Sequence, residues 1–291
     1  MRQRHECRQD MERSLAERQR LFEELYATYN RPEFIHPDPL EFLHSYQEPS
    51  DREIVGLIAS SLAYGRVAQI ISSVSFILDK MGPSPREFLE SASRRTLSRS
   101  FTGFKHRFTT TEELIDFMLG IQQVIRTDGS LQRCFLKWHD PDDPDTVQAL
   151  QSFVDAIRSS MGSRDNSLLP CPAKKSACKR LHLFLRWMIR KDEVDPGGWR
   201  NVSPSKLIIP LDTHMHRIGL LLGMTQRKQS DLKTALEITR EFRKIVPDDP
   251  VKYDFALTRL GIRDDADLSV LMEPRGHNYR PKNPARGECY G

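Results

Sequence analysis

Residues 208–223 read Ile-Ile-Pro-Leu-Asp-Thr-His-Met-His-Arg-Ile-Gly-Leu-Leu-Leu-Gly and join an apolar run to the start of a helix. Pro210 disfavours helix at the residue before it, and Asp212 is of a residue type that caps helix N-termini. Apolar residues then recur at helical spacing until Gly223, which is of the type that ends helices. The stretch therefore predicts a helix that begins at Asp212, whose carboxylate can cap the helix or stabilise a positive charge that develops beside it.

Helix boundaries elsewhere in the chain carry similar signals. Ser50–Glu53 and Thr110–Glu113 have the pattern of a capping box, and Gly129 is placed to end the second of these helices. Tyr64–Arg66 contains a glycine between two apolar periodic segments, which favours a turn between helices. No alternating pattern typical of strands persists for more than four residues. We predict an all-α protein of about ten helices.

Composition shifts divide the chain into three parts. Residues 1–50 form a highly charged helix and a proline-punctuated connector, and residues 51–268 form a helical domain. Residues 269–291 are polar and rich in proline and arginine, which predicts a flexible basic tail.

The overall composition is that of a soluble globular protein. The 291 residues are 29% charged and 38% hydrophobic, with a formal net charge of +4. No stretch is apolar enough for a membrane span, and the N-terminus lacks the apolar region of a signal peptide. We therefore expect a cytoplasmic protein that does not contact membranes and is a monomer.

The cysteines and histidines argue against a metal centre. Five scattered cysteines form no Cys-x-x-Cys pair, which excludes the common zinc and iron–sulfur patterns and a disulfide framework. His214 and His216 are two residues apart and so lie on different faces of a helix. We expect neither a metal nor a cofactor.

Local basic clusters permit a nucleic-acid partner. They are Arg94-Arg95, Lys105-His106-Arg107, Lys174-Lys175, Lys179-Arg180 and the segment from Arg186 to Lys191. Each of them can equally be a solvated surface.

Three segments in this order resemble the helix-hairpin-helix DNA glycosylase superfamily, which includes endonuclease III and the 8-oxoguanine glycosylases, the archaeal ones among them. They are Leu57 to Arg66, Leu168-Leu169-Pro170 leading to Lys179-Arg180-Leu181-His182-Leu183, and Pro210-Leu211-Asp212-Thr213-His214 followed by Arg217-Ile218. The resemblance covers roughly residues 52–80 and 168–262. More closely, 179–190, 210–214 and 249–257 are similar to a bacterial family known only as a conserved domain of unknown function, to which we assign the chain.

The superfamily resemblance implies a two-lobed helical fold and a DNA N-glycosylase that can also act as an abasic-site lyase. Asp212 matches the superfamily aspartate, which stabilises the sugar cation formed when the base leaves. Lys179 matches the lysine that attacks C1′ to form a Schiff base, and Lys175 is the alternative nucleophile. Lys179 is favoured because it lies in the helix, where its direction is fixed.

The same resemblance implies contacts to duplex DNA with a damaged base flipped out, and thus a place at the nucleoid. The predicted DNA-binding residues are Tyr64, Arg66, Lys105, His106, Arg107, Lys174, Arg180 and Arg217. The predicted base pocket is formed by Trp187, Trp199 and His214, although core positions would also suit these residues.

One departure and two alternatives stand beside this interpretation. Residues 170–173 read Pro-Cys-Pro-Ala where the superfamily has a Gly-x-Gly hairpin that binds a phosphate through amides. Because proline has no N–H, this loop argues against a backbone phosphate site. The alternatives are a catalytically silent nucleic-acid-binding module, in which Asp212 is only a cap, and a protein-interaction scaffold.

Overall fold

The computed structural model of the chain describes residues 2–161, 165–262 and 271. Its α-helices are α1 (Arg2–Tyr29), α2 (Pro49–Ser61), α3 (Val67–Met81), α4 (Pro85–Ser91), α5 (Arg94–Ser100), α6 (Thr111–Asp128), α7 (Leu131–Leu136), α8 (Val147–Arg158), α9 (Lys179–Ile189), α10 (Thr213–Leu221), α11 (Leu232–Ile245) and α12 (Asp254–Ile262). Four short 3-10 helices are η1 (Pro32–Phe34), η2 (Pro39–Ser45), η3 (Pro172–Lys174) and η4 (Pro204–Lys206). One antiparallel hairpin joins β1 (Lys105–His106) to β2 (Thr109–Thr110). The all-α prediction is confirmed.

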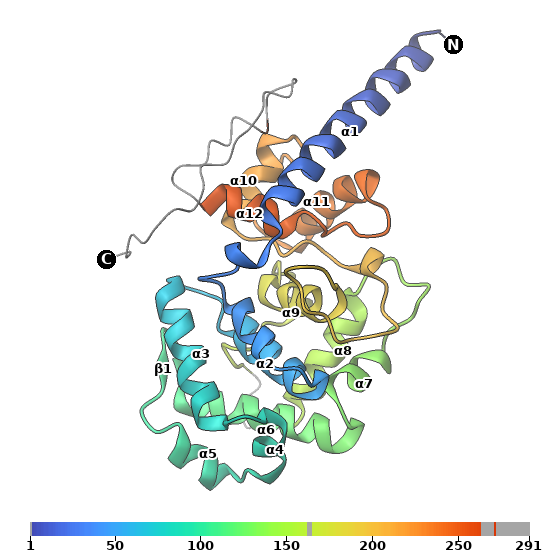
Figure 1. Cartoon of the computed structure of the whole chain (residues 1–291). Helices are drawn as coiled ribbons and strands as arrows, with labels where there is room; N and C mark the ends of the chain where they lie inside the picture. The colour runs from blue at the N-terminus through green and yellow to red at the C-terminus, as the bar shows by residue number, and fades with distance from the viewer. Residues whose placement is uncertain (1, 162–164, 263–270, 272–291) are drawn as a thin grey trace.

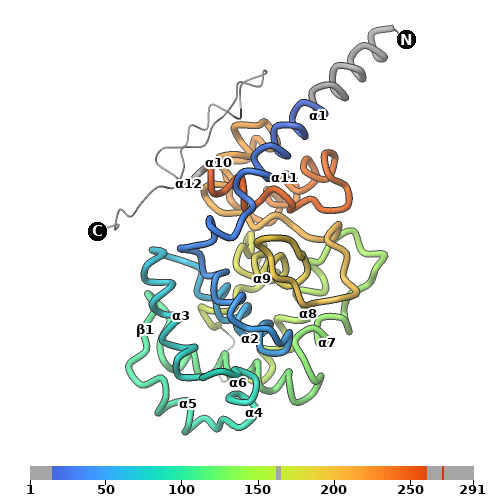
Figure 2. The backbone as a smooth tube through the Cα atoms, viewed as in Figure 1, coloured from blue at the N-terminus to red at the C-terminus, as the bar shows by residue number. Residues whose placement is uncertain are grey.

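The helices gather in two groups with α9 between them (Figure 1). Helices α10, α11 and α12 form one group together with the C-terminal part of α1, and α2 to α8 form the other. The backbone trace in Figure 2 passes between the groups after α1 and again after α9. The N-terminus of α9 meets the N-terminus of α10, since Lys179 and Asp212 at these two helix starts lie 3.5 Å apart.

The C-terminal part of α1 belongs to the hydrophobic core. Phe22, Leu25 and Tyr29 are buried, and the Phe22 ring lies 5.8 Å from that of Phe242 in α11 and 5.2 Å from that of Tyr253. Burial of aromatic side chains of this size is a major source of stability. The predicted division at residues 50 and 268 stays a prediction, and the tail predicted over 269–291 lies outside the described residues except for Leu271.

Several predicted helix boundaries are confirmed. Thr110 and Glu113 form a reciprocal capping box at the start of α6, and Gly129 ends that helix with φ +82°. Residues 62–66 connect α2 to α3, with Gly65 at φ +101°, a conformation that L-residues rarely adopt. Gly223, at φ +66°, follows α10 as predicted.

The capping box predicted at Ser50–Glu53 is wrong. Helix α2 begins at Pro49, whose ring fixes a helical φ, and its N-cap residue Glu48 makes no side-chain cap. Glu53 is buried instead, and its carboxylate accepts the amide N–H groups of Leu131 and Gln132 at 2.8 and 3.0 Å. The glutamate therefore caps α7, which is distant in sequence, rather than its own helix.

Helices α6 and α8 cross at Gly120, where a side chain has no room. A Cβ atom at this position would lie 2.6 Å from the backbone oxygen of Ile157, which cannot move without displacing α8. We expect Gly120→Ala to lower the free energy of unfolding by about 1–3 kcal/mol through overpacking, even though alanine is favoured over glycine in helices by about 1 kcal/mol. Urea denaturation of both proteins measures the difference.

Gly56→Ala is the matched control, since the nearest atoms to its new Cβ are the ends of the Leu43 and Met188 side chains at 3.2 and 3.3 Å. These can shift, so we expect a smaller loss than at Gly120. Equal losses at the two positions would contradict the close helix crossing.

Candidate active site

Lys179 and Asp212 lie beside each other at the junction of the two helix groups. Lys179 is the first residue of α9 and Asp212 is the N-cap of α10. The Lys179 Nζ atom is 3.5 Å from Asp212 Oδ2, and the two side chains are 34% and 19% exposed. The other carboxylate oxygen, Oδ1, accepts the amide N–H of Met215 at 2.8 Å. Asp212 thus caps its helix with one oxygen and faces the lysine amine with the other.

Local backbone structure fixes both residues. Cys178, directly before Lys179, is left-handed with φ +43°, which turns the chain sharply into α9. Ile208, Ile209 and Leu211, before Asp212, are buried. The amide N–H of Ile209 also donates to Thr239 Oγ1 of α11 at 3.0 Å. The carboxylate therefore follows a buried apolar segment that leaves it little freedom.

Two buried arginines extend the face of α9 that carries Lys179. Arg186 and Arg190 follow it at i+7 and i+11, which is the spacing of one helix face. Arg186 pairs with Asp195 at 3.1 Å and with Asp254, the first residue of α12. Both arginine side chains are only 4% exposed. The basic cluster from Arg186 to Lys191 is therefore not a solvated surface at these two positions.

The second arginine has three carboxylate partners. Arg190 pairs with Asp192 and Asp249, both at 2.8 Å, and also with Asp195. Sequence reasoning missed the role of these arginines, although an arginine inside the apolar 181–189 segment and a second one four residues later were a usable signal. Buried charges of this kind are found where they are paired. The network connects α9 to the segment that leads into α12.

A second carboxyl group interacts electrostatically with Asp212. The pKa of Asp254 is raised to about 6, because burial raises it, the charge of Arg186 lowers it and the negative charge of Asp212 raises it. Asp254 Oδ2 bonds to Arg186, while Oδ1 has no hydrogen-bond partner among the described residues. Helix α12 packs against α10, so this acidic group is part of the support behind the Lys179–Asp212 pair.

Arg180, the residue after Lys179, contacts the predicted turn at Tyr64. The Arg180 guanidinium lies 4.8 Å from the centre of the Tyr64 ring and donates to the Ser61 carbonyl at 2.6 Å. Burial lowers the pKa of Arg180. Both predicted DNA-binding residues therefore have structural contacts, and Arg66, the next predicted residue in the turn, is exposed.

His106 does not reach the surface. Its side chain is fully buried, with Nδ1 bonded to Ser73 Oγ at 2.9 Å and Nε2 to the Tyr64 carbonyl at 3.1 Å. Tyr64 in turn donates to the His106 carbonyl and shares a hydrogen bond with Thr109 Oγ1. Burial lowers the pKa of His106. The predicted phosphate contact does not fit this position, because both ring nitrogens are already occupied; Lys105 and Arg107 on either side are exposed.

The two tryptophans of the predicted base pocket have core positions. Trp187 is 1% exposed and Trp199 is 6% exposed. The Trp199 ring packs with Phe135, Phe153 and Phe184, at centroid distances of 5.5, 6.4 and 5.1 Å. Neither ring is open to a base. His214, two residues after Asp212, is half-buried and is the one predicted pocket residue near the pair in the chain.

The loop before α9 is closed to backbone phosphate binding, in agreement with its prolines. The amide N–H of Ala173 donates to Gln151 Oε1 at 2.7 Å. Those of Lys174 and Lys175 donate to carbonyls within the loop, at 3.1 and 2.8 Å. The Lys174 side chain pairs with Asp165, and the side chains of Lys175 and Arg217 are exposed. Lys175 lies in this loop, as expected of the alternative nucleophile.

A family model described as a protein of unknown function (DUF2400) matches residues 38–263. The chain belongs to the DUF2400 family. This confirms the predicted membership of an uncharacterised family. No similar protein was found among curated proteins or among solved structures. The helix-hairpin-helix resemblance therefore has no support from these comparisons.

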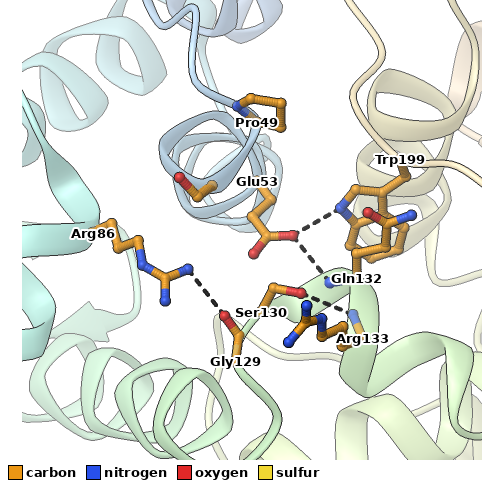
Figure 3. A pocket seen from close by; sticks show the side chains of 9 residues that line it. Pro49, Glu53, Arg86, Gly129, Ser130, Gln132, Arg133 and Trp199 are labelled. Atoms are coloured by element: carbon orange, nitrogen blue, oxygen red, sulfur yellow. Dashed lines mark hydrogen bonds between the residues drawn. The ribbon is translucent and has the colours of Figure 1, made fainter.

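The matched DUF2400 region also contains a polar cavity of about 460 Å³ at the N-terminal end of α2 (Figure 3). Its lining residues are Pro49, Ser50, Glu53, Arg86, Gly129, Ser130, Gln132, Arg133 and Trp199. Burial raises the pKa of Glu53, but both of its oxygens accept N–H groups, one of them the Trp199 indole N–H at 2.9 Å. Because its carboxylate is fully engaged, this cavity is less suited to chemistry than the Lys179–Asp212 pair.

Two further features concern the part of the chain that the structure describes. Its histidines, cysteines and carboxylates form no group of three that could hold a metal ion. Its helices include none with the length and apolar character needed to cross a membrane.

His182, on α9 between Lys179 and Arg186, gives a test of burial on this helix. Burial lowers the pKa of His182 from 6.5 to about 4, so below pH 6.5 the unfolded chain gains a proton that the folded chain does not. The folded state therefore loses stability as the pH falls from 6.5 towards 4, by about 2 kcal/mol at pH 5. We expect His182→Leu to remove this part of the pH dependence, measured by urea denaturation at pH 7.5 and pH 5.

The measured quantity is the difference between the wild type and His182→Leu in how the free energy of unfolding changes with pH. This difference cancels the contribution of Asp254, which is present in both proteins and has the opposite sign to that of His182. Its raised pKa means that the folded state binds a proton first, which adds stability as the pH falls through 6. Identical pH dependence in the two proteins would show that His182 is not buried in its neutral form.

Proposed function

We propose that the chain is a DNA N-glycosylase with abasic-site lyase activity, in which Lys179 is the nucleophile and Asp212 stabilises the sugar cation. The observation that carries the proposal is the 3.5 Å approach of Lys179 Nζ to Asp212 Oδ2 at the ends of two helices. An amine and a carboxylate, both fixed and both partly exposed, are the two groups that this chemistry needs. The placement of helices on either side of α9 supports the two-lobed architecture proposed with it (Figure 1).

The reaction follows from these two groups. The ammonium of Lys179 first loses a proton to water, and the free amine attacks C1′ of the flipped nucleotide. The bond from Nζ to C1′ forms as the N-glycosidic bond breaks, and the electron pair leaves with the base, which takes up a proton. Nζ then loses a proton, the C1′–O4′ bond breaks and O4′ takes up a proton, which opens the sugar ring and leaves the C=N bond of a Schiff base. The ionised Asp212 carboxylate stabilises the positive charge that develops on the sugar as the base leaves.

The surroundings of the pair suit an anionic polymer. The N-termini of α9 and α10 are the positive ends of their helix dipoles, and both lie at the pair. Exposed basic side chains occur on the preceding loop at Lys175, on α10 at Arg217 and on the turn at Arg66. Phosphate binding by such residues would give affinity for DNA that falls with salt.

The second candidate function is a nucleic-acid-binding module without catalysis. It is favoured by the hydrogen bond from the Met215 amide N–H to Asp212, which gives the carboxylate a purely structural role as a helix cap. A protein-interaction scaffold is the third, and it predicts no salt-dependent affinity for DNA. Substitutions at the two charged residues distinguish the first two candidates.

Lys179 and Lys175 can be distinguished by trapping. Borohydride reduces a Schiff base to a stable amine, so incubation with abasic or oxidised-base DNA is expected to give a covalent adduct. We expect the adduct with the wild type and with Lys175→Ala, and at least a hundredfold less with Lys179→Ala, since Lys179 is the one lysine among the described residues that pairs with Asp212. Denaturing gel electrophoresis of labelled DNA measures the yield.

An adduct that persists in Lys179→Ala and disappears in Lys175→Ala would reverse the assignment. The absence of any adduct, together with base release by the wild type, would indicate an enzyme that uses water as the nucleophile.

Asp212→Asn distinguishes the role of Asp212 as a helix cap from the role of its negative charge. Asparagine keeps a side-chain oxygen that can accept the Met215 N–H, so the free energy of unfolding is expected to fall by less than about 1 kcal/mol. Base excision is expected to fall by at least about a hundredfold, because the negative charge that faces the sugar cation is lost. Single-turnover excision assays and urea denaturation on the same preparations measure the two effects. Equal excision by both proteins would leave Asp212 as a cap alone.

A further inference from the structure

The β1–β2 hairpin exposes an aromatic side chain at its tip. Arg107 and Phe108 connect the two strands, and the Phe108 side chain is 72% exposed. Arg107 is left-handed with φ +53°, and its guanidinium lies 5.3 Å from the centre of the Phe108 ring. A phenylalanine this open to water contributes little to the core, so its position needs another reason.

The hairpin holds this ring on a rigid support. Behind the tip, His106 is buried against Ser73, and Thr109 Oγ1 lies 2.6 Å from both the Tyr64 hydroxyl and Ser167 Oγ. These hydrogen bonds connect the hairpin to α3, to the turn before α3 and to the loop after α8. An aromatic group that is fixed before it binds loses little conformational entropy on binding.

The tip and the 64–66 turn form one surface, which we call the tip surface: Arg66, Val67, Lys105, Arg107 and Phe108. The Arg107 side chain lies over Gly65, where a Cβ atom would be 2.7 Å from Arg107 Cδ. Val67 is 41% exposed, and Arg66 and Lys105 are exposed beside it.

The positive charge and the exposed apolar side chains of the tip surface indicate the chemical class of its partner. Across the described residues, no carboxylate pairs with Arg66, Lys105 or Arg107, although these three cations lie close to two exposed apolar side chains. A partner that presents both negative charge and flat apolar rings satisfies both features, and nucleic acid does so through its phosphates and its bases.

A short series of contacts joins the tip surface to the candidate active site. Arg107 packs over Gly65, the neighbouring Tyr64 ring is covered by Arg180, and Arg180 follows Lys179 in the chain. The tip surface is thus connected through the 64–66 turn to the start of α9, which carries Lys179.

We propose that Phe108 stacks on a DNA base where the duplex is interrupted, while Arg66, Lys105 and Arg107 bind the phosphates on either side. The inference rests on DNA as the partner in the proposed function, but not on the lysine chemistry. Intact duplex offers the three cations its phosphates but offers the ring no unpaired base. Phe108 therefore sets the preference for interrupted over intact duplex, and the cations set the affinity for both.

The test compares two duplexes of the same sequence, one intact and one with a tetrahydrofuran abasic analogue. Fluorescence anisotropy gives the Kd of each over a series of salt concentrations. The wild type is expected to bind the abasic duplex more tightly than the intact one. Phe108→Ala is expected to lower this preference about tenfold or more, because the stacking is lost. Phe108→Trp, which keeps an aromatic ring, is expected to keep the preference. Because Phe108→Ala removes no charge, the slope of log Kd against log salt is expected to stay unchanged, whereas Arg107→Ala lowers it by about one.

Trp138→Ala is the matched control, since this side chain is also an exposed aromatic, at 53%, but lies outside the tip surface. It is expected to bind both duplexes like the wild type. A wild type that binds without preference, or a Phe108→Ala protein with unchanged preference, would overturn the proposal. A dimer that Phe108→Ala dissociates, with DNA affinity unchanged, would overturn it too and assign the tip to self-association.

The outcome is independent of the trapping experiment. If Phe108→Ala loses the preference for the abasic duplex and the wild type gives no borohydride adduct, the proposed role of the tip surface is supported and the proposed lyase chemistry is contradicted. If the wild type gives an adduct and Phe108→Ala keeps the preference for the abasic duplex, the lyase chemistry is supported and the role of the tip surface is contradicted.

Discussion

The buried pairing of two arginines with carboxylates of the C-terminal segments determines how the two helix groups meet. Arg186 lies on α9 and Arg190 directly follows it, while Asp249 and Asp254 lead into and begin α12, so each ion pair joins α9 to the C-terminal helix group. A buried charge without its partner is strongly unfavourable, typically by about 3–5 kcal/mol. The relative position of the groups is therefore constrained at the same helix face that carries Lys179, and the short distance to Asp212 depends on that constraint.

Much of the helical architecture could be predicted from local sequence. The Asp212 cap, the Thr110–Glu113 capping box and the turn at Gly65 all depend on residues a few positions apart, and all are found in the structure. Ser50–Glu53 has the same pattern and fails, because Glu53 is used by the backbone of α7, 78 residues away. A pattern in the sequence cannot show which of two possible partners a carboxylate will take.

The candidate site was predictable only as separate residues. Asp212 could be singled out by its position at a helix start and Lys179 by the superfamily resemblance, and their side chains lie 3.5 Å apart in the structure. Burial argues against three of the predicted contacts: His106, Trp187 and Trp199 have residue types that suit nucleic-acid contacts, yet each lies in the core. Phe108 shows the opposite case, since a phenylalanine in a basic stretch gives no sign in sequence that it faces water.

The helix α1 lies before the region that defines the family, yet it completes the core. The matched region starts at residue 38, while Phe22 in α1 packs against Phe242 and Tyr253 within that region. A chain that began at residue 38 would contain the whole family region and would present those two rings to solvent. The boundary of the family, drawn from sequence similarity, therefore differs from the boundary of the stable folding unit. A protein truncated at residue 38 would expose an apolar surface, prone to association, where α1 now lies.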